Sequence, residues 1–460
     1  MEPIRISEIV SAVGGVLQKG NPNAEVTSVS TNSREIQPGA LFVPIIGEKV
    51  DAHQFIPMAL ESGAEACLTQ EPDESLKFLD GAVIQVEDTQ KALQDFAAWY
   101  RGRFSIPVIG VTGSVGKSST KEMIAAALSQ GKRIHKTAGN YNSQIGLPLT
   151  VFGLDHTHEV AVIEMGMSNF GEMERLSAIA RPTSAVMTNI GISHIEQLKT
   201  QENIRGEKLH IADTIGEGGV LYLNGDDPLL RPLRESYPKK ITWYGTAEDC
   251  GYRAENIDTV KDCTRFDLHA PFGVHKVMIP ALGIHNVSNA LAAIAVAYDQ
   301  GLSLDDIRCG LLTYEGLAMR QQIHELERVT VIDDSYNASP DSIKSGIGVL
   351  KAVKSAGKKI AVLADMRELG EHSAQAHFEL GTYAAKNGVD AIVTVGKEAE
   401  RIAEGALAER PDLFVKICAA NDEAFAELEK ILCDGDCVLI KGSRGMHTDE
   451  IVQKLLTKYQ

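Results

Sequence analysis

The sequence has little positive charge and few aromatic side chains. Among 460 residues, 45 Lys and Arg stand against 62 Asp and Glu, which gives a formal net charge of −17, and aromatic residues make up only 5%. A surplus of negative charge repels a phosphate backbone, so we expect no general binding to nucleic acid. With so few aromatic residues, small aliphatic side chains must fill the core, as is typical of α/β proteins.

Clustered cysteines and long apolar runs are also missing. Cys433 and Cys437 are the only close pair among seven cysteines, and no second pair completes a zinc set. This pattern favours free thiols in a reducing compartment. No apolar run is long enough to span a membrane, and Met1–Arg5 does not begin a signal peptide. We therefore expect a cytoplasmic protein without membrane insertion.

The length and the order of the expected elements predict an α/β protein of three domains, since a domain typically has ~150 residues. We place a small N-terminal α/β domain at 1–103, with a strand over 41–46. Strands and helices alternate in the central domain, 104–316, which predicts a mostly parallel sheet. Further strands at 329–332, 359–363, 391–395 and 438–441 predict a C-terminal Rossmann-like domain over 317–460.

The stretch Gly113-Ser114-Val115-Gly116-Lys117-Ser118-Ser119 has the pattern of a phosphate-binding loop. An apolar run at 106–109 predicts the strand before it, and 123–128 predicts the helix after it. Glycines allow main-chain N–H groups to turn onto an anion, and the helix N-terminus adds partial positive charge. Lys117 has the length to reach the β- and γ-phosphates of ATP, and the Ser118 hydroxyl suits Mg²⁺. Val111 stands where the strict pattern has glycine, and an ordinary strand-to-helix turn is the alternative.

Reactive side chains follow two more strands of the expected central sheet. Glu164 ends the strand at 160–163, where it is either a Mg²⁺ ligand or a surface carboxylate. His194 follows the strand at 185–188 and is either a metal ligand or an ordinary loop histidine. Asn140 belongs to a loop rich in turn formers and amides, which either is structural or lines the nucleotide site.

Together these stretches resemble the Mur ligase family over nearly the whole chain. The matching motifs are Asn32-Ser33-Arg34, Gly47-Glu48, Gly113–Ser118, Gly139–Asn142, Thr188–Gly191, Asp334–Ala338, Asp365–Gly370 and Gly442–Met446. Tyr336-Asn337-Ala338 and Asp365-Met366 resemble the family member that adds D-alanyl-D-alanine. The Asp-Asn-Pro-Arg signature of the diaminopimelate-adding member is absent from the sequence.

The resemblance implies a role for each part of the chain. The N-terminal domain would hold the UDP end of the substrate, the central domain would hold ATP, and the C-terminal domain would bring in the amine. The residues that match binding positions are Ser33, Arg34, Gly47 and Asp51 for the UDP substrate, Asn286 and Asn289 for adenine, Arg320 and Asp334 for the nucleotide, and Asn337 and Asp365 for substrate.

The resemblance also implies metal chemistry at four positions. Ser118, Glu164 and His194 would hold Mg²⁺, and Lys208 would carry CO₂ as a carbamate, which turns a cation into an anionic oxygen ligand. From the residues alone, a surface lysine on a helix is the alternative at Lys208. The sequence departs from the family pattern at Asn32, where Asp is common, at Ser118, where Thr is commoner, and at His210, where an acid is usual.

We therefore expect an ATP-dependent amide ligase that joins D-alanyl-D-alanine to UDP-N-acetylmuramoyl-tripeptide through an acyl phosphate. Its partners would be small-molecule substrates, and the family resemblance implies a monomer. The alternatives are another ligase of the same type, such as a folylpolyglutamate synthase or an amino-acid-adding muramyl ligase, a phosphotransferase, and a non-catalytic nucleotide-binding regulator.

Overall fold

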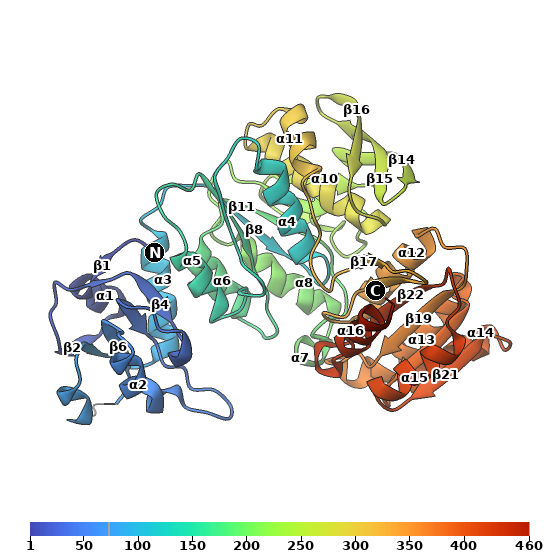
Figure 1. The fold of residues 1–460 in the computed structure, drawn as a ribbon. Helices are drawn as coiled ribbons and strands as arrows, with labels where there is room; N and C mark the ends of the chain where they lie inside the picture. Colours follow the sequence, from blue (N-terminus) through green and yellow to red (C-terminus); the bar gives the residue numbers. More distant parts are fainter. Residues whose placement is uncertain (72–73, 460) are drawn as a thin grey trace. The chain divides into compact units, whose positions relative to one another are not determined.

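The computed structural model describes residues 1–71 and 74–459, and the chain divides into two compact units. The first unit comprises residues 1–112, 132–186 and 207–220, and the second comprises residues 113–131, 187–206 and 221–460. Figure 1 shows the chain as a ribbon and labels many of its helices and strands. No helix formed by the described residues has both the length and the apolar surface that crossing a bilayer requires.

An N-terminal sheet lies in the first unit, with the strand order β2-β7-β6-β5-β4. Strand β2 is antiparallel to β7, and the other neighbours are parallel. The strands are β2 (Val16–Lys19), β4 (Ser28–Ser30), β5 (Ala40–Phe42), β6 (Ala66–Thr69) and β7 (Ala82–Gln85), and β1 (Ile4–Arg5) pairs separately with β3 (Glu25–Val26). The helices are α1 (Ile6–Val13), α2 (Ile56–Glu61) and α3 (Thr89–Arg101). Phe42, Ile56 and Leu60 share a buried cluster that packs α2 against this sheet.

Strand β5 is shorter than the strand predicted over 41–46, because it ends at Phe42. Val43 still donates its N–H to the carbonyl of Ser30 (2.9 Å), but Pro44 has no N–H to continue the ladder. Beyond Pro44, Ile46 pairs only in an isolated bridge with Asp51. The segment between these two residues is therefore a loop outside the sheet, and its two ends pair with each other.

The strands of the predicted central domain belong to a nine-stranded sheet. In the first unit the strand order is β11-β8-β10-β9, and β10 is parallel to both β8 and β9. These strands are β8 (Val108–Thr112), β9 (Ile134–Lys136), β10 (Val160–Glu164) and β11 (Ser184–Met187). The first unit also contains α5 (Gly146–Phe152) and α6 (Glu172–Ala180). Helices α4 (Lys117–Leu128) and α7 (Ile195–Leu198) belong to the second unit, and α8 (Gln201–Leu209) begins in the second unit and ends in the first.

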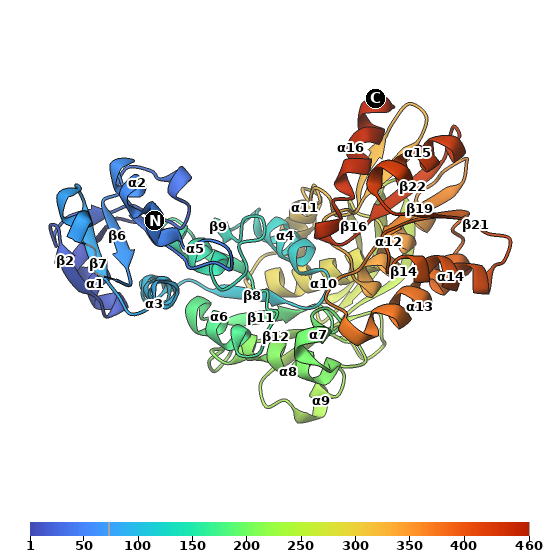
Figure 2. The same ribbon diagram turned by 90° about the horizontal axis from the view of Figure 1, so that it is seen from below.

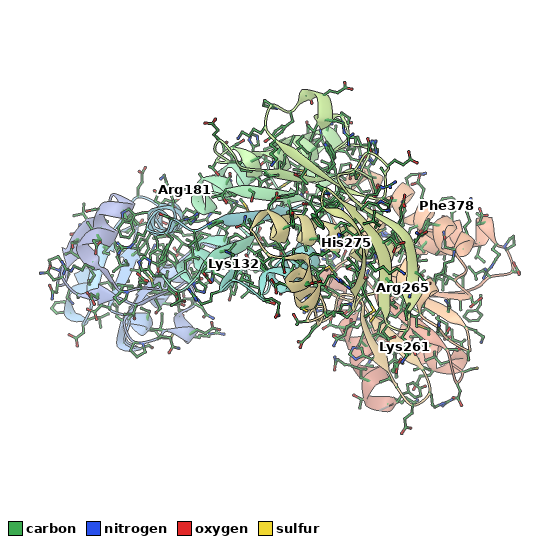
Figure 3. The ribbon with its side chains drawn as sticks, turned by 90° about the horizontal axis from the view of Figure 1, so that it is seen from above. Lys132, Arg181, Lys261, Arg265, His275 and Phe378 are labelled. Atoms are coloured by element: carbon green, nitrogen blue, oxygen red, sulfur yellow. The ribbon has the colours of Figure 1, made fainter. Side chains whose placement is uncertain are left out.

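In the second unit this sheet continues in the order β12-β13-β14-β15-β16. Strands β12 to β14 are parallel, whereas β14, β15 and β16 are antiparallel. Figure 3 shows Arg265 on β15 and His275 on β16, with Lys261 in the turn between β14 and β15. The elements are β12 (Leu221–Asn224), α9 (Leu233–Ser236), β13 (Ile241–Gly245), β14 (Tyr252–Val260), β15 (Cys263–Ala270), β16 (Gly273–Ile279), α10 (Ile284–Asp299) and α11 (Leu304–Leu311).

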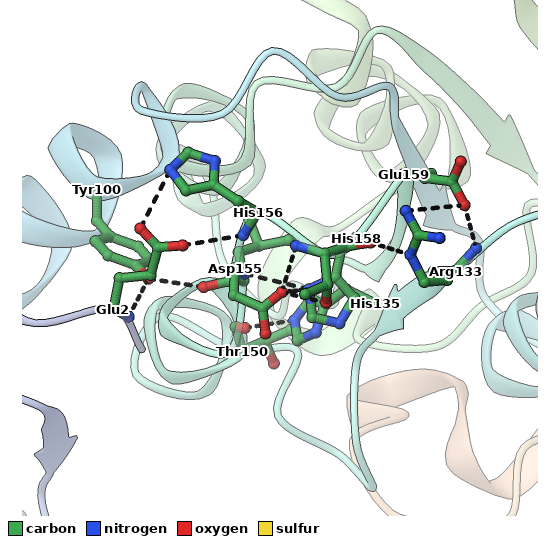
Figure 4. A network of polar contacts seen from close by, with 11 residues as sticks. Glu2, Tyr100, Arg133, His135, Thr150, Asp155, His156, His158 and Glu159 are labelled. Carbon is green, nitrogen blue, oxygen red and sulfur yellow. Dashed lines mark hydrogen bonds and ion pairs between the residues drawn. The ribbon is translucent and has the colours of Figure 1, made fainter.

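A polar network in the first unit joins the start of the chain to the segment after α5 (Figure 4). The Glu2 N–H donates to the Tyr100 hydroxyl (2.8 Å), which itself donates to the carbonyl of Leu154 (2.7 Å). The side chain of Glu2 also lies 3.2 Å from Nε2 of His156. Because Tyr100 is fully buried, these bonds fix the beginning of the chain on α3 and on the loop after α5.

The C-terminal sheet has the order β17-β18-β22-β19-β20-β21, and only β17 is antiparallel to its neighbour. The strands are β17 (Gln322–Glu325), β18 (Thr330–Asp333), β19 (Lys359–Ala364), β20 (Ala391–Val395), β21 (Phe414–Cys418) and β22 (Cys437–Lys441). The helices are α12 (Pro340–Ala352), α13 (Ser373–Lys386), α14 (Glu400–Glu409), α15 (Asn421–Ile431) and α16 (Asp449–Lys458).

Alternate residues of the C-terminal strands fill two separate cores. Cys437 and Leu439 join the cluster with α12, α13 and α14, while Val438 and Ile440 join the cluster with α15 and α16. Figure 2 shows these two groups of helices on opposite faces of the sheet. Since side chains alternate along a strand, a continuous apolar run is what a sheet covered on both faces needs. The predicted doubly wound domain is confirmed.

Two glycines let α13 and α14 pack closely. A Cβ on Gly381 would lie 1.9 Å from the carbonyl oxygen of Ile402, and a Cβ on Gly405 would lie 1.9 Å from that of Phe378. Neither contact is sterically possible, so the distance between the helices depends on both glycines.

We expect Gly405→Ala to destabilise the C-terminal domain by about 1–3 kcal/mol, because a backbone shift must relieve the clash. Gly348→Ala is the matched control, since Gly348 also lies in a helix but a Cβ on it would have no neighbouring atom within 4 Å. The control should be neutral or gain up to about 1 kcal/mol from helix propensity. Urea unfolding followed by circular dichroism measures both, and equal midpoints for the two variants would contradict the packing argument.

Candidate active site

The predicted phosphate loop lies between the end of β8 and the first residue of α4. Gly113 and Gly116 have φ values of 144° and 87°, which L-residues with a side chain rarely adopt. A Cβ on Gly113 would lie 1.9 Å from Oγ1 of Thr188. Val111, which replaces the glycine of the strict pattern, is a buried residue of β8, so the loop begins only after Thr112.

The segment after β11 holds this loop in place. Ser114 and Val115 donate their N–H groups to the main-chain and side-chain oxygens of Asn189 (3.0 and 2.9 Å), and Gly191 donates to Oγ of Ser114 (2.8 Å). The Thr188 hydroxyl donates to the carbonyl of Val115 (2.5 Å). Thr188 and Asn189 belong to a motif matched in the sequence, but no role was predicted for either residue. The sequence feature that could have indicated a role for them is their position after a strand end.

Lys117 begins α4, and its ammonium group lies over the loop. Nζ donates to the carbonyl oxygens of Gly113 (2.7 Å) and Ser114 (3.3 Å). Ser118, in the same first turn of the helix, is buried. A fixed cation at the positive end of a helix makes this loop suited to a polyphosphate.

Helix α10 places the buried side-chain amides of two asparagines beside α4. The Thr120 hydroxyl donates to Oδ1 of Asn289 (2.9 Å), and Nδ2 of Asn289 donates to Oδ1 of Asn286 (3.1 Å). Asn286 in turn donates to the carbonyl of Leu282 (2.8 Å). The structure therefore places both residues that match the adenine positions beside the helix of the phosphate loop.

In the first unit, Glu164 ends β10 and is 1% exposed, so the surface-carboxylate alternative is wrong. Its Oε1 accepts a hydrogen bond from Nδ2 of Asn142 (2.7 Å), and its N–H donates to Thr137 (2.9 Å). Asn140 is exposed in the same loop as Asn142, and its carbonyl accepts the Asn142 N–H (2.7 Å). Sequence reasoning missed that Asn142 orients the carboxylate.

Lys208 lies at the end of α8 and is also 1% exposed, so it is not a surface lysine. The neighbouring Glu207 accepts the N–H of Met173 (3.0 Å), while His210 pairs with Asp213 (2.7 Å) at the surface. Burying an ammonium group is costly unless it is paired or changes its charge state. A buried lysine is compatible with the predicted carbamate.

His194 has a φ of 63° and stands immediately before α7. Its Nδ1 lies 2.6 Å from the carboxylate of Glu368, and this contact lowers the pKa of Glu368. The sequence did not predict that Glu368 contacts His194, nor that this contact comes from the segment after β19. Because Nδ1 faces Glu368, Nε2 is the ring nitrogen left for a metal ion.

The residues matched to the UDP substrate follow two neighbouring strands of the N-terminal sheet. Ser33 and Arg34 lie in a 3-10 turn after β4, and Asn32 accepts the Arg34 N–H (3.1 Å), so Asn caps this turn. After β5, Gly47 donates its N–H to Val50 (2.9 Å). A hydrogen bond from the His53 N–H lowers the pKa of Asp51, which keeps this exposed group anionic.

In the C-terminal domain, Asp334 forms a buried ion pair with Lys441, which ends β22. Nζ lies 2.8 Å from Oδ2 of Asp334 and donates to the carbonyls of Asp334 (3.3 Å) and Asn337 (2.8 Å). Burial raises the pKa of Asp334 and lowers that of Lys441, while their attraction opposes both shifts. Lys441 was not among the predicted site residues, although the sequence places it at a strand end.

Asn337 and Asp365 line the same ends of β18 and β19. The side chain of Asn337 accepts the N–H groups of Ala338 (2.9 Å) and Arg444 (3.4 Å). The side chain of Asp365 accepts a hydrogen bond from the Ala399 N–H (2.7 Å), and the main-chain carbonyl of Asp365 accepts one from the Ser443 N–H (3.2 Å). Strands β18 and β19 both run parallel to β22, which lies between them, so the residues predicted to bind substrate follow strand ends at the same edge of this sheet.

The predicted metal ligands come from both units. Glu164 and Lys208 belong to the first unit, and Ser118 and His194 belong to the second. Within the ranges 1–71 and 74–459, no group of three or more His, Cys, Asp or Glu side chains is arranged to hold a metal ion.

A glycine-bent loop between a parallel strand and a helix, with a lysine above it, defines a phosphate-loop protein that binds a nucleotide. Models of the Mur ligase family cover three segments of this chain. The catalytic domain matches residues 25–101, the middle domain residues 111–297, and the glutamate ligase domain residues 319–444.

Full-length relatives agree with these matches. The UDP-N-acetylmuramoyl-tripeptide–D-alanyl-D-alanine ligase of Bacillus subtilis (strain 168) is 38% identical over 460 residues, which cover 98% of each chain. The crystal structure of MurF from Acinetobacter baumannii has a TM-score of 0.92 at 31% identity over 100% of both chains. That of MurF ligase from Thermotoga maritima in complex with ADP has a TM-score of 0.84 at 28% identity, over 94% of this chain and 98% of that one. This chain belongs to the Mur ligase family, and its three-domain α/β architecture is confirmed.

We expect Lys441→Met to destabilise the C-terminal domain by about 3–5 kcal/mol, because Asp334 then stays buried without its cation. The double variant Asp334→Asn with Lys441→Met removes both charges and should recover part of this loss. Urea unfolding measures the three proteins. A single variant as stable as the unmodified protein would show that the pair contributes little.

Proposed function

We propose that this chain is an ATP-dependent ligase that adds D-alanyl-D-alanine to UDP-N-acetylmuramoyl-tripeptide, a step in making the peptidoglycan precursor. The observation that carries this proposal is the bent phosphate loop, with Lys117 above it, in a chain that matches D-alanyl-D-alanine ligases from end to end. The substrates are small molecules, and the reaction takes place in the cytoplasm on a monomer. A net charge of −17 makes nucleic acid an unsuitable partner.

The reaction has two steps. An oxygen of the tripeptide's terminal carboxylate attacks the γ-phosphorus of ATP, the bond to the β,γ-bridging oxygen breaks, and ADP leaves. The free amine of D-alanyl-D-alanine then attacks the acyl carbon and loses a proton. Inorganic phosphate leaves with the former carboxylate oxygen, and an amide remains. The acyl phosphate is needed because a carboxylate alone has no adequate leaving group.

The first step joins two anions, so the chain must supply positive potential. Lys117, held over the loop by Gly113 and Ser114, lies where the β- and γ-phosphates are expected, and the first turn of α4 adds its N–H groups. Asn286 and Asn289 hold the adenine end, and Arg320 and Asp334 contact the nucleotide from the C-terminal side. Asn140, in the loop after β9, is the further residue that we propose for nucleotide binding.

The donor set fits Mg²⁺ at several positions. Ser118 offers a buried hydroxyl, and Glu164 offers a carboxylate oriented by Asn142, both oxygen ligands of the kind that Mg²⁺ prefers. His194 would add Nε2, and Lys208 would add oxygen ligands once carbamylated. Bound Mg²⁺ would neutralise phosphate charge as it develops.

The remaining residues recognise the two ends of the substrates. Ser33, Arg34, Gly47 and Asp51 lie at neighbouring strand ends and bind the UDP part. Asn337 and Asp365 lie at strand ends of the C-terminal domain and position D-alanyl-D-alanine. Excluding water around the acyl phosphate favours attack by the amine over hydrolysis.

One incubation tests the proposed reaction. The protein is mixed with ATP, Mg²⁺, D-alanyl-D-alanine and UDP-N-acetylmuramoyl-tripeptide labelled with oxygen-18 in its terminal carboxylate. We expect the pentapeptide product by mass, together with oxygen-18 in the released phosphate. Parallel reactions with single amino acids or with a pterin substrate test the other ligase activities. A stable phosphorylated tripeptide formed without any amine would instead indicate a phosphotransferase.

We expect Lys117→Ala to lower kcat/KM by a factor of about 10²–10³, the loss typical of one preorganised electrostatic donor. Lys354→Ala is the control, because Lys354 is an exposed lysine just beyond α12, away from the site. Steady-state phosphate release measures both variants. Turnover of Lys117→Ala within twofold of the unmodified protein would exclude the loop as the phosphate site.

A further inference from the structure

Arg320, the residue matched to a nucleotide contact, lies in the linker between α11 and β17. The residues on both sides of it, Met319 and Gln321, have φ values of 60° and 57°. This left-handed conformation is unfavourable for residues with a side chain, and it persists only where the surroundings impose it. The linker is therefore held in one defined shape at Arg320.

Three contacts impose that shape. Arg320 donates its N–H to the carbonyl of Leu317 (3.2 Å), and Tyr336 donates its N–H to the carbonyl of Met319 (3.1 Å). On the other side, Oε1 of Gln321 lies 2.7 Å from Nε2 of the partly buried His285, one residue before Asn286 on α10. The linker is thus bound to the C-terminal domain and to the helix that carries the adenine-matched residues.

The side chain of Arg320 has a partner as well. Its guanidinium carbon lies 4.2 Å from the centre of the Tyr336 ring, well within the range of a cation–π contact. Tyr336 follows Asp334 by two residues, so its position depends on the same strand end as the buried ion pair. A guanidinium group carries N–H donors on several sides, so the donors that do not face the ring can bind an anion.

Arg320 and the start of the phosphate-loop helix both influence one tyrosine of this linker. Tyr314, in the same linker, hydrogen-bonds through its side chain to Ser119 in the first turn of α4. Burial raises the pKa of Tyr314, whereas the bond to Ser119 and the positive charge of Arg320 lower it. Arg320 and the start of α4 therefore act on the same hydroxyl.

We propose that Tyr336 is a positioning residue, whose ring and main-chain N–H hold Arg320 in the orientation that meets the polyphosphate of ATP. This inference rests on the proposed function, because it needs Arg320 to contact the nucleotide. In this role Tyr336 acts through Arg320 and not on a substrate. It acts by reducing the freedom that a long arginine side chain would lose on binding.

Isothermal titration with AMPPNP and with AMP, both in the presence of Mg²⁺, tests the proposal. We expect Tyr336→Leu to weaken AMPPNP binding about 3- to 20-fold, the range of a lost cation–π contact. AMP, which lacks the β- and γ-phosphates, should bind with unchanged affinity. Tyr336→Phe keeps the ring and should retain most of the AMPPNP affinity, and Tyr336→Met repeats the loss with a side chain of different shape should the Leu variant fail to fold.

Two further variants separate this role from a structural one. Tyr383→Leu removes another tyrosine with a cation above its ring, Lys344 at 5.8 Å, and should not change AMPPNP binding. In an Arg320→Met background, Tyr336→Leu should have no further effect, because the group that it positions is gone. Melting temperatures of all variants show whether they are folded.

The outcomes distinguish the two proposals. If Arg320→Met binds AMPPNP normally, the nucleotide role of Arg320 in the proposed function is wrong, and the inference fails with it. If Arg320→Met weakens binding but Tyr336→Leu does not, only the inference is wrong. Equal weakening of AMPPNP and AMP by Tyr336→Leu, or the same loss with and without Arg320, would show a purely structural role.

Discussion

The close approach of two loops at neighbouring strand ends determines the shape of the phosphate loop. Gly113 has no side chain, and the Thr188 hydroxyl occupies the space that a Cβ would need. Asn189 then takes two N–H bonds from Ser114 and Val115, which aligns the loop before any anion binds. In a protein with a net charge of −17, a polyphosphate must be held by such fixed local groups, because the overall field opposes it.

The C-terminal domain also holds polar groups in fixed positions, but it does so by a different arrangement. Apolar residues that alternate along its strands fill a core on each face, so polar groups collect at the strand ends. Lys441 binds the Asp334–Asn337 segment there from a fully buried position. Tyr336, within that segment, contacts the linker that carries Arg320. The Asp334–Lys441 ion pair, the Asp334–Asn337 segment and the linker that carries Arg320 are thus connected. Together they support the residues matched to nucleotide and substrate.

Sequence motifs predicted local structure better than they predicted which side chains contact one another. The phosphate loop and the doubly wound C-terminal domain were predicted from apolar runs and glycine positions, whereas the strand over 41–46 was drawn too long because Pro44 interrupts its ladder. Glu164 and Lys208 were each left with a surface alternative, since one residue in a sequence does not reveal its burial. Asn142 and Lys441 were given no role, because their partners Glu164 and Asp334 lie far away in the sequence.

The sequence by itself determined the class of fold, the position of the phosphate loop and the family, because these depend on residue types at short and regular spacings. Only the tertiary structure decided that Glu164 and Lys208 are buried, that Glu368 faces His194, and that Tyr336 lies on Arg320. Those facts arise where strand ends and loops distant in the chain are packed together. Burial, charge pairing and orientation are properties of that packing, and no single segment contains them.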